Sequence, residues 1–197
     1  IEDGNFELEQ KADAVLLKKV ESENDVVLYE NFYKEVPKAI SNATLRIFGE
    51  RNDINLVCVM EGRAPQKDGE IALDRLFAEN RELKIGDSVV LGGEKLEIVG
   101  TVALSDYSAQ FQNNSDMMFD AIKFDVAMVT QEGFDSLHKT VHYSYTWNYV
   151  DIPADEVEQK AKSDDFMKAL LTQVVCDDKE LEDYMPRYAN PAINFAT

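Results

Sequence analysis

The sequence predicts an α+β fold: a larger lobe built on a mixed sheet, with a small β-rich lobe that contains one helix inserted into it. Segments with strand-like alternation and segments with helix-like apolar spacing follow one another along the chain. A glycine pair near the middle joins two strand-like segments as a hairpin. The 197 residues are 45% hydrophobic, which is enough for one sizeable core or for two lobes.

Strand and helix signals alternate in the N-terminal third of the chain. Apolar residues at positions 8, 12, 15, 16 and 20 are spaced as on one side of a helix, with charged residues between them. A strand is predicted for "DVVLYENFY" (25–33). Two more are predicted for "TLRIF" (44–48) and "NLVCVM" (55–60), and the polar turn between these two indicates that they pair as a hairpin.

The clearest local signal is "DSVVLGGEKLEIVG", which predicts a hairpin over 87–99. A short strand, "EIAL", and a helix precede it. The two glycines suit the positive φ angles of a two-residue hairpin turn. That turn sets Leu91 opposite Glu94 and Val89 opposite Leu96, so the apolar side chains gather on one face.

In the C-terminal half, the pattern predicts a strand at 124–130, a short helix at 131–138 and an aromatic-rich strand at 142–150. A longer helix then begins near Pro153, because proline suits a first helical turn. The charged run at 163–165 suggests an interruption of this helix.

These elements predict two lobes. Residues 1–60 and 125–197 form the main lobe, and residues 61–124 form the inserted lobe. The insertion holds the hairpin 87–99 and ends in a connecting segment, 105–124. Because a unit of this size is small for independent stability, we expect it to pack on the main lobe.

The charge balance excludes two classes of partner. The chain has 38 acidic and 20 basic side chains, and its formal net charge is -18. Such a surface repels the phosphates of nucleic acids and the anionic head groups of a membrane. We therefore expect no nucleic acid partner. The longest apolar runs also fall well short of the roughly 18 to 20 residues that a membrane-spanning helix needs.

The sequence lacks the patterns of a catalytic or metal-binding protein. His138 and His142 are four residues apart, but "HKTVH" lacks the glutamate of a zinc protease, and the predicted helix ends between them. Cys58 and Cys176 are too few for a disulfide framework, and Cys58 is predicted to be a small buried side chain. We expect no catalytic residues, no metal site and no cofactor.

A short segment, "EGRAPQKDGEIALD" (61–74), has the mixed composition of an active-site loop. Its glycines fit neither a phosphate-binding loop nor a dinucleotide fingerprint. Arg63 has the chemistry to hold an anion, but in so acidic a chain it is expected to pair with a nearby carboxylate. We interpret the segment as a structural turn that enters the insertion.

The string "EGRAPQKDGEIALDRLFAENRELKIGDSVVLGGEKLEIVG" is followed by "DYSAQFQNNSDMMFDAIKFDVAMVTQEGFD". Together they resemble the extracellular core domain of FtsX-like ABC transporter permeases, also called the MacB-type periplasmic core domain. The similarity is strongest from Glu61 to Asp135. One departure is Arg81-Glu82, where the family pattern has an Asn-Gly pair, and it affects only the local end of a helix.

The resemblance implies a non-catalytic domain on the extracellular face of the plasma membrane, in a protein whose spanning helices lie before residue 1 and beyond residue 197. It implies a main lobe like the porter domains of efflux pumps and a smaller inserted lobe. The implied partners are a cytosolic ATPase subunit, a second permease copy, and a peptide, lipoprotein or cell-envelope factor.

The connecting segment carries the candidate contact residues. "DYSAQFQNNSDMMFDAIKF" (106–124) sets apolar side chains among polar ones, a composition suited to an adaptable surface. The alternative is that these side chains fill the seam between the lobes. The candidates for contact with substrate or partner are Tyr107, Phe111, Met117, Met118 and Phe119.

A second class of function remains open from the sequence, namely a free-standing secreted binding protein or an accessory domain of a hydrolase. The two classes differ in what surrounds the chain in its gene. About 20 apolar residues on each side would indicate the permease.

Overall fold

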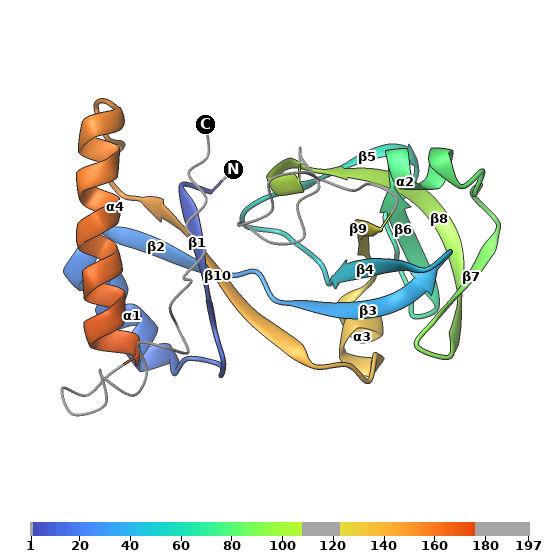
Figure 1. Ribbon diagram of the computed structural model, residues 1–197, viewed down its shortest axis with the longest axis horizontal. Helices are drawn as coiled ribbons and strands as arrows, with labels where there is room; N and C mark the ends of the chain where they lie inside the picture. The colour runs from blue at the N-terminus through green and yellow to red at the C-terminus, as the bar shows by residue number, and fades with distance from the viewer. Residues whose placement is uncertain (1, 108–122, 176–197) are drawn as a thin grey trace. The chain divides into compact units, whose positions relative to one another are not determined.

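The computed structural model describes residues 2–107 and 123–175, which form an α+β fold with ten strands and four α-helices. These residues divide into two compact units (Figure 1). Unit 1 comprises residues 31–142. Unit 2 combines residues 2–30 with residues 143–175, so unit 1 is inserted into it along the chain.

Unit 2 consists of a three-stranded antiparallel sheet and two helices. In the sheet, β10 lies between β1 and β2 and pairs antiparallel with both. The strands β1 and β2 therefore run parallel to one another with a later strand between them, which is a split β-α-β arrangement. The elements are β1 (Gly4–Leu8), α1 (Ala14–Asn24), β2 (Val26–Glu30), β10 (Val141–Tyr149), α4 (Glu156–Leu170) and a π-helical turn (Leu171–Val175).

The core of unit 2 is aromatic. Trp147 and Tyr145 of β10 are fully buried, and Phe6 of β1 stacks on Tyr145 with ring centres 5.4 Å apart. Phe166 of α4 meets the edge of Trp147 at 4.9 Å. Figure 1 shows α1 and α4 on the same side of the three strands. A side chain at Gly4 would overlap the Trp147 ring, so this strand has room only for glycine there.

Both helices of unit 2 differ from the sequence-based prediction. Leu8 ends strand β1, and α1 starts only after Asp13, whose carboxylate accepts a hydrogen bond from the N–H of Val15 at 2.8 Å. Helix α4 is continuous where an interruption was predicted. Ser163 and Phe166 face the core while the two aspartates between them are exposed, so the charged run fits the outer side of an unbroken helix.

Unit 1 is built on a mixed sheet whose strands follow the order β3-β4-β9-β6-β8-β5, with β7 paired to β8. The pairs β4–β9 and β6–β8 are parallel, and the others are antiparallel. The elements are β3 (Tyr33–Ile40), β4 (Ala43–Phe48), β5 (Val57–Gly62), β6 (Glu70–Asp74), α2 (Arg75–Asn80), β7 (Ser88–Leu91), β8 (Glu94–Leu104), a 3-10 turn (Ser105–Tyr107), β9 (Phe124–Met128) and α3 (Gln131–Ser136).

The hairpin over 87–99 is confirmed. Leu91 pairs with Glu94 and Val89 with Leu96, as the glycine turn predicted. Gly92 and Gly93 have φ angles of 61° and 98°. The inward side chains of the hairpin join a core cluster that also contains Phe77 of α2 and Phe134 of α3.

The predicted hairpin between residues 44–48 and 55–60 is wrong. Strand β4 pairs with β3 and β9, and β5 pairs with β8. The single strand predicted over 25–33 is instead the end of one strand and the start of another, because β2 ends at Glu30 and β3 begins at Tyr33. Strand β3 turns into β4 through Ser41 and Asn42, whose φ angles are 50° and 66°.

Cys58 is exposed, although its apolar neighbours predicted burial. The reason is the position of β5 at the end of the sheet order, where five of its six residues are exposed. Cys176 lies outside the described residues.

The two units divide the chain at different residues from the predicted lobes. The sequence placed the boundaries after residue 60 and after residue 124, whereas the units change at 30/31 and 142/143. Strand pairing accounts for the difference, because β9 pairs with both β4 and β6. The β6–β9 hydrogen bonds join the predicted insertion to a strand of the predicted main lobe, and β9 in turn pairs with β4 of that lobe.

Candidate functional site

Tyr107 is the one predicted contact residue within the described part of the chain. It ends the 3-10 turn after β8 and is half-buried. Its hydroxyl accepts a hydrogen bond from Nη1 of Arg46 at 2.7 Å, and its ring packs against Phe48 and Phe124 with centres 5.7 and 6.4 Å away. Burial raises the pKa of Tyr107, although the charge of Arg46 acts in the opposite direction. Its ring and hydroxyl are thus held by the core of unit 1.

Arg46 organises the polar contacts around Tyr107. It comes from β4 and is only 8% exposed. Its Nε and Nη2 both donate to Oε1 of Glu35 on β3, at 3.1 and 2.7 Å. The guanidinium carbon lies 4.0 Å from the centre of the Tyr33 ring, a cation–π distance. Arg46 therefore links three elements, β3, β4 and the 3-10 turn, at the point where the connecting segment begins.

A second arginine anchors the same turn. Nη1 of Arg51 lies 2.7 Å from Oδ1 of Asp106, and each side chain keeps only 6% of its surface exposed. The guanidinium of Arg51 lies over the ring of Phe48, 3.8 Å from its centre. The two arginines therefore contact different rings of one group of packed aromatic side chains. We call this group the Arg46–Arg51 cluster, and its members are Arg46, Arg51, Tyr33, Phe48, Tyr107 and Phe124.

The other predicted contact residues, Phe111, Met117, Met118 and Phe119, lie outside the described residues. Their role stays a prediction. The structure adds that the described residues on both sides of this segment, Tyr107 and Phe124, pack within the Arg46–Arg51 cluster.

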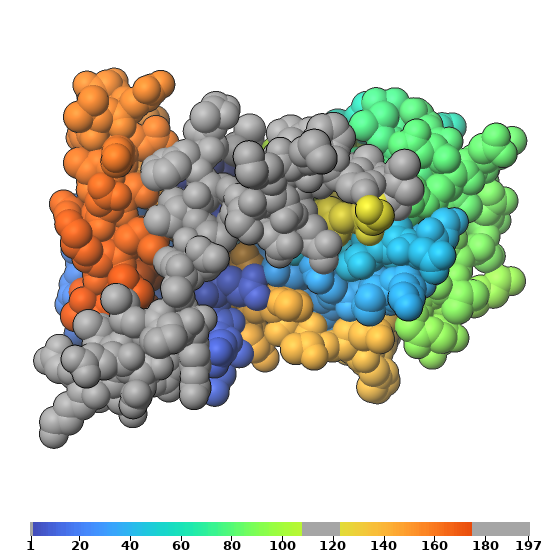
Figure 2. Space-filling model, viewed as in Figure 1, coloured from blue at the N-terminus to red at the C-terminus, as the bar shows by residue number. Residues whose placement is uncertain are grey.

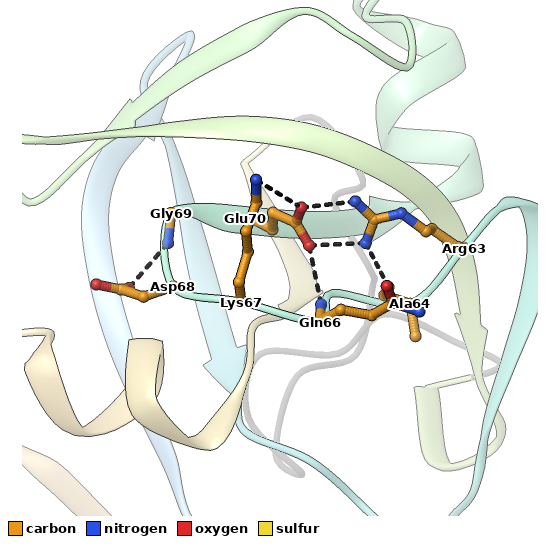
Figure 3. Close-up of polar contacts among 7 residues, drawn as sticks. All are labelled: Arg63, Ala64, Gln66, Lys67, Asp68, Gly69 and Glu70. Carbon is orange, nitrogen blue, oxygen red and sulfur yellow. Dashed lines mark hydrogen bonds and ion pairs between the residues drawn. The ribbon is translucent and has the colours of Figure 1, made fainter.

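The segment 61–74 is a structural turn, as predicted. Arg63 and Glu70 form a bidentate ion pair, with N···O distances of 2.7 and 2.6 Å (Figure 3). The N–H of Gln66 donates to the same carboxylate at 2.9 Å. Glu70 is buried at the start of β6 while Arg63 is partly exposed, so the arginine closes the turn over the carboxylate. The expected pairing of Arg63 with a nearby acid is confirmed.

The contacts within this turn change the titration of Glu70. The hydrogen bonds from Arg63, followed by the one from Gln66, hold the pKa of Glu70 at about 2, well below its usual range. At neutral pH the carboxylate is fully ionised and its partners are within the turn. This arrangement indicates that Glu70 stabilises the turn and does not act as a proton donor or acceptor.

The two histidines have separate environments. The ring of His142 stacks on Tyr33, with centres 4.6 Å apart and an angle of 5° between the planes. His138 is exposed and lines a cavity of about 300 Å³ together with Ile47, Leu91, Val129, Asp68 and Lys95. Figure 2 shows the β7–β8 hairpin beside the segment after α3, and a Cβ on Gly92 would lie 3.1 Å from Leu137.

A buried carboxylate lies on β9. Asp125 is fully buried, and its Oδ1 accepts the N–H of Val126 at 2.6 Å. Burial, and then the nearby charge of Asp74, raise the pKa of Asp125 to about 8, while Arg81 acts in the opposite direction. Asp74 is itself committed to capping α2, where it accepts the N–H of Leu76 at 2.8 Å. At neutral pH the Asp125 carboxyl is therefore mostly protonated.

Residues 2–107 and 123–175 contain no group of three or more histidine, cysteine or acidic side chains close enough to hold a metal ion. Within the same ranges, none of the helices combines the length and the apolar character needed to cross a bilayer.

Sequence reasoning missed Arg46 and Arg51. Arg46 lies within the predicted strand "TLRIF" and was given no role, and Arg51 belongs to the polar segment interpreted as a hairpin turn. One signal was available, because an arginine inside an otherwise apolar strand, "TLRIF", requires either an exposed face or a buried partner.

No family model and no curated protein matches the chain. Solved structures similar to it include the periplasmic region of MacB from Actinobacillus actinomycetemcomitans, at 11% identity and TM-score 0.44, covering 86% of this chain and 84% of that one. The extracellular domain of the noncanonic ABC-type transporter YknZ from Gram-positive bacteria is similar at 10% identity and TM-score 0.47, covering 100% of both chains. A domain of a protein described as a permease, from Porphyromonas gingivalis, is similar at 11% identity and TM-score 0.41, covering 91% of this chain and 85% of that one.

Proposed function

We propose that this chain is the non-catalytic extracellular domain of an FtsX-like ABC transporter permease. In this role it couples ATP hydrolysis by a cytosolic subunit to the handling of a peptide, lipoprotein or envelope substrate outside the plasma membrane. The observation that carries the proposal is the resemblance over Glu61 to Asp135. In the structure these residues include β9, β6 and β8, which are neighbours in the middle of the unit 1 sheet, and β7, which pairs with β8.

The insertion of unit 1 into unit 2 supports the proposal. The first and last described segments belong to unit 2, whose split β-α-β sheet is the kind of compact layer expected of a porter-like lobe. We assign unit 2 to that lobe and unit 1 to the inserted lobe. In a permease, unit 2 would then be the part connected to the spanning helices, and unit 1 would carry contacts with the substrate or with a second permease copy.

The test begins with the gene. The natural reading frame is expected to encode about 20 apolar residues on each side of this chain, and an adjacent frame is expected to encode the phosphate loop "GxxxxGK[ST]" of an ATPase. The full-length protein should remain with the membrane fraction after a high-salt wash. A frame with no apolar flanks, and a product released into the medium, would favour the free-standing binding protein instead.

The coupling is tested in cells that produce the complete transporter. Crosslinking through an introduced photoreactive residue at exposed Leu56 should capture different partners in the active complex and in one whose ATPase phosphate-loop lysine is replaced. The same photoreactive residue, introduced at exposed Ile152, provides a matched position in unit 2. Identical crosslinks in the active and inactive complexes at both positions would contradict coupling to ATP hydrolysis.

A further inference from the structure

Arg51 is enclosed, yet only part of its hydrogen-bonding capacity is used. It lies in the loop between β4 and β5, and Nη1 donates to Oδ1 of Asp106 at 2.7 Å and to the carbonyl oxygen of Asn55 at 3.4 Å. One face of the guanidinium lies over Phe48. These contacts occupy one nitrogen and one face of the group, and the side chain keeps only 6% of its surface exposed.

The other two nitrogens of Arg51 have no hydrogen-bond partner anywhere in residues 2–107 and 123–175. Nε and Nη2 lie on one edge of the guanidinium, and their N–H groups point in nearly the same direction. A buried charged donor without an acceptor is unfavourable for folding, so such a group calls for an explanation. A pair of oxygens on a carboxylate or phosphate fits this edge in bidentate fashion.

We propose that the Nε–Nη2 edge of Arg51 is a binding site for the carboxylate of a partner polypeptide, supplied either by a chain terminus or by an Asp or Glu side chain. The inference does not depend on the transporter assignment. It concerns chemistry that this loop offers whatever the chain is attached to.

The charges around Arg51 favour a carboxylate over a phosphate. Arg51 is already paired with Asp106, and the neighbouring Arg46 is paired with Glu35. Any incoming anion therefore adds its full charge to a nearly neutral, poorly solvated cluster. A monoanion is less unfavourable there than a phosphate, which carries nearly two charges at neutral pH.

The arginine has more donors than its structural role requires. Joining the loop to the 3-10 turn needs one donor toward Asp106, and a lysine would supply it. The planar group adds two parallel N–H donors that this ion pair leaves unused. Nε and Nη2 are themselves closed to solvent, whereas Asn52, Asp53 and Leu56 of the same loop are exposed, so a partner's carboxylate would reach this edge by displacing the loop.

The experiment is a titration of the 15N-labelled 197-residue chain, observed at the Nε–H signal of Arg51, with acetate, acetamide and inorganic phosphate as probes. Acetate is expected to shift this signal downfield and to saturate with a Kd of about 1 to 10 mM, the order of affinity of one bidentate contact. Acetamide should give no saturable shift, and phosphate should bind more weakly than acetate. No saturable response to acetate up to about 100 mM, or an equal response to acetamide, would overturn the proposal.

Two variants separate this site from a purely structural role. Arg51→Lys keeps the charge but lacks the two parallel donors, so the acetate response at the backbone amides of Asn55 and Asp106 should weaken at least about tenfold. Arg75→Lys, at an exposed pair with Glu79, is the matched control and should bind acetate like the wild type. An unchanged acetate affinity in Arg51→Lys would contradict the site.

Asp106→Asn tests the site if Arg51→Lys does not fold. It preserves the Nε–Nη2 edge and removes the adjacent negative charge, so acetate should bind several-fold more tightly; unchanged or weaker binding would count against the proposal. Three short peptides then distinguish the sources of the carboxylate. Two share one sequence without acidic residues and have either a free or an amidated C-terminus, and the third is amidated and has a glutamate in place of one internal residue. Binding of the free-acid peptide alone assigns the site to a chain terminus, binding of the glutamate peptide assigns it to a side chain, and binding of none of the three would overturn the proposal.

Discussion

Replacing Asp125 by asparagine should remove a pH dependence from the stability of unit 1. The carboxyl is fully buried, and its pKa of about 8 lies roughly four units above the value of about 3.9 in an unfolded chain. At pH values below about 4 both states hold the proton. As the pH rises toward 8, the unfolded state releases the proton while the folded state keeps it, so the free energy of unfolding falls.

The size of the effect follows from the same two pKa values. Each pH unit between them removes about 1.4 kcal/mol from the free energy of unfolding, or about 3 kcal/mol between pH 5 and pH 7. Asparagine has nearly the same shape, is neutral at every pH, and can still accept the N–H of Val126 through its carbonyl. Relative to the wild type, Asp125→Asn should therefore gain about 3 kcal/mol over this range.

The assay is urea unfolding of both proteins at pH 5, 6 and 7, analysed as the difference between them at each pH. Taking the difference cancels the other titrations of this acidic chain. Asp53→Asn, at an exposed position in unit 1, is the matched control and should show no such trend. A constant difference between wild type and Asp125→Asn would refute the reasoning. A trend of opposite sign would mean that Asp125 is ionised and paired with Arg81.

Three further changes test other contacts. Gly4→Ala places a methyl group against Trp147 and should lower the free energy of unfolding by about 1 to 3 kcal/mol. Because Trp147 is the single tryptophan of the chain, its fluorescence should shift as well. Unchanged stability would show that the ring has room to move. Lys34→Met removes the ammonium that donates to the carbonyls at the end of α3, at 2.5 and 2.7 Å, and should cost about 2 kcal/mol by urea unfolding. Glu70→Gln should lower the urea midpoint at pH 7, and the difference from wild type should narrow as the pH falls from 4.5 toward 2, since the low pKa of Glu70 contributes stability only while it is ionised. A difference that is independent of pH would contradict the role given to Arg63.

Local signals in the sequence predicted local structure well. The hairpin over 87–99 was predictable with its register, because the glycine pair specifies a turn type and alternation then assigns every side chain to a face. The pairing of Arg63 was predictable from the acidic surroundings alone. In each case, all the residues that decide the outcome lie within a few positions of one another.

Pairings between distant strands were not predictable in this way. Strand β4 pairs with β3, to which it is joined by a turn at Ser41-Asn42. Its other partner, the parallel strand β9, lies far along the chain. The turn has no glycine, and its positive φ angles rest on a serine and an asparagine, so its signal is weak. The polar segment after β4 then provided a stronger but misleading turn signal.

The candidate site illustrates the same limit. Tyr107 was found from composition, but its partners Arg46 and Arg51 lie on or just after β4, more distant in sequence than any local pattern reaches. Burial of a charged side chain is decided by what the tertiary fold brings against it. The Arg46–Arg51 cluster could therefore be identified only from the structure, whereas the connecting segment next to it could be identified from the sequence.

The position of β10 has a consequence for the order of folding during synthesis. Its first residues pair with β3 in unit 1, and the remainder forms the middle strand between β1 and β2. The ribosome makes β1 and β2 early, but they have no partner until the whole of unit 1 has been made. Unit 1 can therefore fold first, while the first thirty residues wait as an incomplete sheet that a chaperone or a neighbouring chain could bind.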